Sequence, residues 1–155
     1  MTLKATERQR PEALPLPLDL DQVRIYRIGC SGRGKLLRNL VLRLSRGRAV
    51  ALGNHVFLPS RCEGDVAVLA HELTHCAQYQ AWGPWRYFRR GIAAQCRELI
   101  HRGLGVGQSP YAYRLEDGKP FEAYGMEQQG QIVEDAFRGA PGARSLTASR
   151  CARAL

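Results

Sequence analysis

The stretch of sequence that decides the fold spans residues 66–82 and reads VAVLAHELTHCAQYQAW. Apolar residues recur in it at helical spacing. Gly64 and Asp65 before it supply an N-cap signal, and Gly83 and Pro84 after it supply a stop signal. We therefore predict one amphipathic helix over residues 66–82. The five residues near its centre read His-Glu-Leu-Thr-His.

The two histidines of this motif, His71 and His75, are spaced for a shared metal. Residues four apart on a helix lie about 40° apart around its axis and one turn along it, so both imidazoles project side by side. A single tetrahedral zinc ion can bridge that separation. Glu72 lies about 100° further round, where a carboxylate can hold a zinc-bound water and accept its proton. The alternative, two surface histidines at chance spacing, is expected in roughly one chain of this length in a hundred or fewer.

A third protein ligand must come from outside this helix. The extended zincin motif HExxHxxGxxH does not fit, because Gln78 and Ala81 stand where it requires glycine and histidine. A helix expected over about residues 122–137 carries Glu127, and Gly130 one turn later would let that helix approach a neighbour closely. Other residues compete for the ligand role, namely Glu98, Glu122, Glu134 and His101.

Residues 69–78, LAHELTHCAQ, resemble the signature helix of a bacterial family of short HExxH metallopeptidase-like domains of unknown function. Members are found near toxin and contractile-injection systems. The resemblance is strongest to the branch related to the Vgr spike proteins of secretion systems. It extends over residues 23–137 and includes GKPF at residues 118–121 and MEQQ at residues 126–129.

This resemblance implies a glutamate-zincin site in which Glu127 is the third zinc ligand, beside His71 and His75. One position departs from the thermolysin-like pattern. Those enzymes carry an aspartate four residues after the glutamate, where it orients a ligand histidine, and this chain has Gln131 there. Another residue, or the amide oxygen of Gln131, must then take that role.

The rest of the chain predicts a small α+β, zincin-like domain with a short sheet, the HExxH helix, a packed second helix and a third helix that bears the ligand. Strands are expected at residues 23–28, 49–52 and 55–58. Helices besides the HExxH helix are expected at residues 36–44, 85–102 and 122–137. The helix over 85–102 is expected to bury one apolar face, made of Trp85, Phe88, Ile92, Cys96 and Leu99. Because zincins pair an edge strand with extended substrate, residues 49–58 are the candidate for that role.

Composition divides the chain into three parts and limits its partners. Residues 1–20 predict a flexible arm, residues 21–138 the zincin-like domain, and residues 139–155 a loose basic tail. The net charge of +9 comes from arginines spread along the chain, so we expect no specific nucleic-acid partner. No run of eighteen apolar residues is present, so no membrane span is expected.

The five cysteines are an odd number without CxxC spacing, which predicts reduced thiols. The amino-terminal sequence lacks the apolar core of a secretory signal. We therefore expect a cytoplasmic protein, or one exported by a route independent of a signal peptide.

These patterns predict a zinc-dependent metallopeptidase that cleaves a peptide or protein substrate, and the family resemblance implies a link to a bacterial secretion or toxin system. Its reaction would need an electrophile for the developing oxyanion. Candidates for that group are Tyr111, Tyr113, Tyr124 and His101. Two alternatives stay open. One is a zinc-stabilised interaction or structural module with little or no catalytic activity. The other is a basic nucleic-acid-binding or effector-binding protein with an incidental metal.

Overall fold

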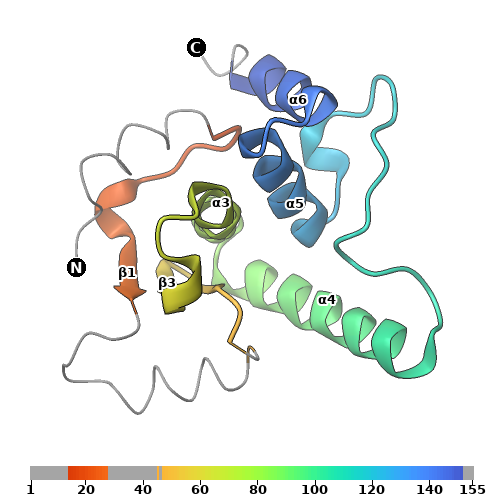
Figure 1. The fold of residues 1–155 in the computed structure, drawn as a ribbon, viewed down its shortest axis with the longest axis horizontal. Coiled ribbons are helices and arrows are strands. Elements are labelled where there is room, and N and C mark those ends of the chain that lie inside the picture. Colours follow the sequence, from red (N-terminus) through yellow and green to blue (C-terminus); the bar gives the residue numbers. More distant parts are fainter. Residues whose placement is uncertain (1–13, 28–44, 46, 152–155) are drawn as a thin grey trace.

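The computed structural model describes residues 14–27, 45 and 47–151 of the chain. Three strands form one sheet: β1 (Arg24–Arg27), β2 (Val50–Leu52) and β3 (His55–Leu58). Four α-helices follow: α3 (Val66–Trp82), α4 (Pro84–Leu104), α5 (Met126–Phe137) and α6 (Pro141–Cys151). The predicted α+β class is confirmed for this part of the chain (Figure 1). The helix expected at residues 36–44 lies outside the described residues.

The sheet has the strand order β1-β3-β2, with β1 parallel to β3 and β2 antiparallel to it. β2 and β3 form the predicted hairpin around Gly53, which has a φ of +63°, a backbone conformation that favours glycine. Because β3 is the central strand, the expectation that residues 49–58 form one edge is wrong for β3. Within residues 49–58, β2 is the strand that forms an edge of the described sheet, and β1 forms the opposite edge.

Helix α3 lies at the centre of the molecule, between the sheet and α5 (Figure 1). The side chain of Asp65 accepts hydrogen bonds from the backbone N–H groups of Ala67 and Val68, so the predicted N-cap is present. Every residue from 69 to 78 is buried. The predicted amphipathic pattern is therefore wrong for the middle of α3, since the sheet, α4 and α5 pack around it. Its polar residues there, the HExxH motif among them, need partners inside the protein.

Helix α4 has its predicted position, but the face that it turns to the protein is not the predicted one. The expectation that Trp85, Phe88, Ile92, Cys96 and Leu99 are buried is wrong, because all five are exposed. Its buried side chains are instead Tyr87, Ala94 and Glu98. This face can be buried because its polar groups have partners: the Tyr87 hydroxyl donates to the Ala51 carbonyl at 2.9 Å, and Glu98 accepts from Ser109 at 2.8 Å.

Both ends of the described chain are more ordered than composition predicts. Residues 141–151 form α6 instead of a loose tail, and α6 packs against α5 through Ala143, which is 1% exposed. In the predicted flexible arm, residues 14–20 alternate leucine with proline or polar residues. Leu14 is buried and Leu16, Leu18 and Leu20 pack against the core.

Among the described residues, no helix combines the length and apolarity that a bilayer span requires.

The centre of the core gives a direct test of this packing. Ile132 of α5 is completely buried, whereas Ile92 of α4 is 65% exposed. Replacing Ile132 by alanine should lower the free energy of unfolding by about 2–5 kcal/mol, because it removes buried methyl groups and leaves a cavity. Ile92→Ala is the matched control and should change it by less than about 0.5 kcal/mol. Urea titration of both variants checks this, and equal losses would contradict the assignment of α5 to the core.

Candidate metal centre

The side chains of His71, His75 and Glu127 form one cluster between α3 and α5. The Nε2 atoms of His71 and His75 lie 3.8 Å and 3.3 Å from Glu127 Oε2, respectively. The three candidate ligand atoms all lie within 4.8 Å of one another. Two atoms that each bind a tetrahedral zinc ion at 2.0–2.1 Å are separated by roughly 3.3 Å. The residues present therefore fit a small divalent metal ion.

The competing candidates for a third ligand lie elsewhere or face the cluster differently. Glu122 is exposed, Glu98 is bonded to Ser109, and the Nδ1 atom of His101 donates to the Gly107 carbonyl at 3.0 Å. Glu134 does reach His71, but at Nδ1, the nitrogen that faces away from the cluster. The structure thus brings Glu127 alone of these candidates to the Nε2 atoms of both histidines.

The other nitrogen of each histidine is held by a fixed acceptor. The Nδ1 atom of His71 lies 3.1 Å from Glu134 Oε2, and that of His75 lies 2.8 Å from Gln78 Oε1. Each Nδ1 therefore donates a proton to oxygen, so Nε2 is the nitrogen that faces the cluster and can bind a metal once it has lost its own proton. Gln78 is itself fixed, because its amide nitrogen donates to the Met126 carbonyl and to Gln129 Oε1.

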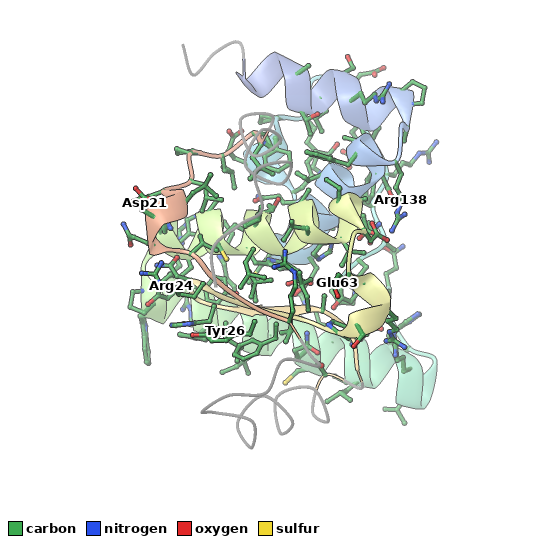
Figure 2. The ribbon with its side chains drawn as sticks, turned by 60° about the vertical axis from the view of Figure 1, so that its left-hand side comes forward. Asp21, Arg24, Tyr26, Glu63 and Arg138 are labelled. Atoms are coloured by element: carbon green, nitrogen blue, oxygen red, sulfur yellow. The ribbon has the colours of Figure 1, made fainter. Side chains whose placement is uncertain are left out.

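The role that the thermolysin-like pattern gives to position 131 belongs here to Glu134. Gln131 instead donates to Asp135 at 3.0 Å. Glu134 also accepts from Arg138, which donates to Asp65 at the start of α3. Arg138 is labelled in Figure 2. Sequence reasoning considered Glu134 only as a ligand and overlooked Gln78 as a partner. Their positions, seven residues after Glu127 and three after His75, would have placed each on the correct helix face.

Gly130 permits the close approach of the two helices. A Cβ atom at this position would lie 2.8 Å from His71 Nε2 and 2.9 Å from His71 Cε1. Real Cβ atoms essentially never lie this close to another atom, so a side chain at position 130 would require the buried His71 ring to shift. The predicted role of this glycine in bringing the helices together is therefore confirmed.

The cluster is electrostatically coupled. Burial opposes the charged form of His71, but hydrogen bonds to Glu127 and Glu134 outweigh it and raise its pKa to about 10. Burial likewise opposes ionisation of Glu127, yet the charges of His75 and His71 hold the pKa of Glu127 below its usual range. Without metal, a proton is thus retained between the imidazoles and the carboxylate. A cation at the same place would displace that proton.

Glu72 lies beside the cluster but is not one of its three candidate ligands. Its Oε2 atom is buried and has no hydrogen-bond partner among the described residues. Burial raises the pKa of Glu72, although the neighbouring histidines oppose that rise. The side chain lines a cavity of about 840 Å³, together with His71, His75 and Glu127. A buried, unpartnered carboxylate oxygen is costly unless it faces water or a bound group, which this cavity can hold.

Among the four candidates for the electrophile, Tyr111 is the one that lines this cavity. Its ring centroid lies 6.4 Å from that of His71. Burial raises the pKa of Tyr111 to about 12, so its hydroxyl keeps its proton at neutral pH. Tyr113 donates to Asp135, and Tyr124 is buried and accepts from the Glu116 backbone.

The close approach at Gly130 can be tested with a matched pair of helical glycines. Gly130→Ala should displace the His71 ring and lower the affinity for added zinc by at least about tenfold. Gly103→Ala is the control, because a Cβ atom there meets nothing within 4 Å. That change should leave zinc affinity unaltered and slightly favour helix α4. Competition titration with a zinc-binding dye checks both variants. Unchanged affinity in Gly130→Ala would show that His71 does not hold the metal from this position.

Two sequence comparisons link the chain to bacterial secretion and contractile injection systems. Residues 9–83 match the family model described as the eCIS core domain. Over 67 residues the chain is 42% identical to the type VI secretion system spike protein VgrG2b of Pseudomonas aeruginosa. That alignment covers 43% of this chain and 6% of the spike protein, so the chain spans a small part of that relative's length.

The family match contains His71, Glu72 and His75 but ends before Glu127. Neither description names an enzymatic activity or a metal. No solved structure is significantly similar to the chain. The similarity therefore supports the association with such a system, whereas the chemistry of the centre has to be argued from its geometry.

Proposed function

We propose that this chain is a zinc-binding, zincin-like module of a bacterial secretion or contractile injection system, and that its metal centre hydrolyses peptide bonds. One observation carries the catalytic part of this proposal. Among the residues that the structure describes, the cluster supplies three ligands, His71, His75 and Glu127, and it opens on a cavity that Glu72 also lines. Structural zinc sites are closed by four protein ligands, whereas catalytic sites keep one position for water or substrate.

The residues of the chain have distinct roles in this proposal. His71, His75 and Glu127 hold the metal, and Glu134 and Gln78 fix the orientation of the two imidazoles. A bound zinc ion supplies Lewis acidity and acidifies water at neutral pH. Glu72 accepts a proton from water and passes it to the leaving amine, a role favoured by its raised pKa. Tyr111 donates a hydrogen bond to the oxygen on which negative charge develops.

The comparisons favour a second candidate function at least as strongly. Both descriptions name parts of a machine, a core domain and a spike, and neither names an enzyme. The chain would then be a zinc-stabilised structural or interaction module of such a system, with little or no catalytic activity. The two functions share the metal ligands and differ in Glu72, because only catalysis requires a carboxylate at that position.

Glu72→Gln separates the two functions. The variant should keep the zinc and the fold, because Glu72 is not among the ligands. Its cleavage of an unfolded substrate such as casein should fall about a hundred- to ten-thousand-fold, the usual contribution of a general base. Glu116→Gln, which lies outside the cavity, is the control and should cleave like the unaltered protein. If the unaltered protein and Glu72→Gln cleave equally, or if neither cleaves a broad peptide library, the structural function replaces the catalytic one.

Zinc binding should release protons and strengthen as the pH rises. The pKa of His71 is raised from 6.5 to about 10 in the metal-free protein, so zinc must displace its proton at neutral pH. The raised pKa of His71 also stabilises the metal-free fold. This contribution to the free energy of unfolding is fully present below about pH 6.5 and is lost as the pH rises toward 10. Calorimetry in two buffers of different ionisation enthalpy should report about one or more protons released per zinc at pH 7. A stoichiometry of one zinc per chain with no proton release would contradict the coupled cluster.

A further inference from the structure

The cavity in front of the metal cluster has an apolar wall that the proposed chemistry does not use. β2 and α4 form most of this wall, and Met126 of α5 completes it. Its apolar members are Val50, Leu52, Phe88, Ile92, Leu99 and Met126. Several of them are unusually open for such side chains: Ile92 is 65% exposed and Leu99 62% exposed. Surface-exposed apolar residues grouped along a cavity are typical of a binding site.

The dimensions of this wall suit an extended peptide. Phe88, Ile92 and Leu99 lie along one side of α4 and span twelve residues, so the rise from the first to the last is about 16 Å. An extended chain covers the same length with about five residues. The hydrogen bond from the Tyr87 hydroxyl to the Ala51 carbonyl joins α4 to β2, so the two sides of the wall are held together.

The same hydrogen bond limits main-chain pairing at the edge of the sheet. β2 is the edge strand, and its Ala51 carbonyl already accepts from Tyr87 at 2.9 Å. A peptide alongside β2 would find this acceptor occupied. Recognition must therefore depend mainly on side chains that contact the apolar wall.

We infer that this wall binds an extended polypeptide segment with bulky apolar side chains, such as leucine or phenylalanine, and presents the adjacent peptide bond to Glu72. This inference rests on the proposed function, because it names the substrate class of the same site. The occupant is a peptide because the wall is continuous with the metal cluster and Glu72 inside one cavity. Leu99 and Ile92, which line the cavity from α4, determine specificity in this arrangement.

Helix α4 offers a closely matched control for Leu99. Leu104 lies on the same helix, is the same residue type and is 75% exposed, but it does not line the cavity. Both leucines are exposed, so replacing either by serine should leave the fold intact. Burial of one leucine side chain changes a binding constant by about tenfold or more.

Binding is measured on the zinc-loaded full chain carrying Glu72→Gln, so that the probe is not cleaved. The probes are two fluorescein-labelled decapeptides: one has Leu-Phe between glycine, serine and glutamine residues, and the other has serine at those two positions. Fluorescence anisotropy should show binding of the first peptide only. Leu99→Ser should weaken that binding about tenfold or more, and Leu104→Ser by less than twofold. Equal binding of both peptides, or equal losses in the two leucine variants, would overturn the inference.

Cleavage by the otherwise unaltered protein distinguishes this inference from the proposed function. Casein fragments are mapped by mass spectrometry, and the cut sites should lie beside bulky apolar residues. Cuts without regard to neighbouring residues would overturn the inference and leave the peptidase function standing. Leu99-dependent peptide binding without any cleavage would support the inference and overturn the peptidase function, leaving a peptide-binding module.

Discussion

His71 lies directly against the backbone of α5 at Gly130, and the rest of the structure depends on this contact. A Cβ atom on residue 130 would be 2.8 Å from His71 Nε2, so α3 and α5 can approach this closely only over glycine. The same approach brings Glu127 to both imidazoles and packs Ile132 and Val133 into the core. The packing of α3 on α5 and the cluster of His71, His75 and Glu127 are therefore consequences of one helix–helix contact.

This arrangement buries several ionisable groups in a small volume. His71, His75 and Glu127 are all at least nine-tenths buried, and removing charged groups from water costs several kcal/mol per ion unless partners compensate. Without metal, hydrogen bonds and shared protons provide that compensation. A divalent cation would provide it more effectively once it had displaced those protons, because both Nε2 atoms and one carboxylate oxygen lie within 4.8 Å of one another. A cluster of this kind is easier to explain as a metal site than as a contribution to stability alone.

The sequence predicted the parts of this centre that depend on local spacing. The caps at Asp65 and Gly83 fixed the limits of α3, and the four-residue spacing placed His71 and His75 on one side of it. Placing Glu127 required the family resemblance together with the glycine one turn later. The orienting role of Glu134 was missed because it depends on where α5 lies relative to α3, whereas that of Gln78 was overlooked although Gln78 lies three residues after His75 on the same helix. The family model, which ends at residue 83, also stops short of α5.

Helix α4 shows where pattern reasoning fails in physical terms. Periodicity finds an apolar face but does not determine which element will cover it. Here the face with Tyr87 and Glu98 is buried, because both polar groups find partners there, and the apolar face borders the cavity. Each large apolar side chain that stays exposed gives none of the roughly 1.5–3 kcal/mol of stabilisation that its full burial would contribute. These exposed apolar side chains lie beside a buried carboxylate with one unpartnered oxygen, an arrangement that binding explains better than stability does. That argument holds for a catalytic centre and for an interaction module alike, and only the carboxylate of Glu72 distinguishes them.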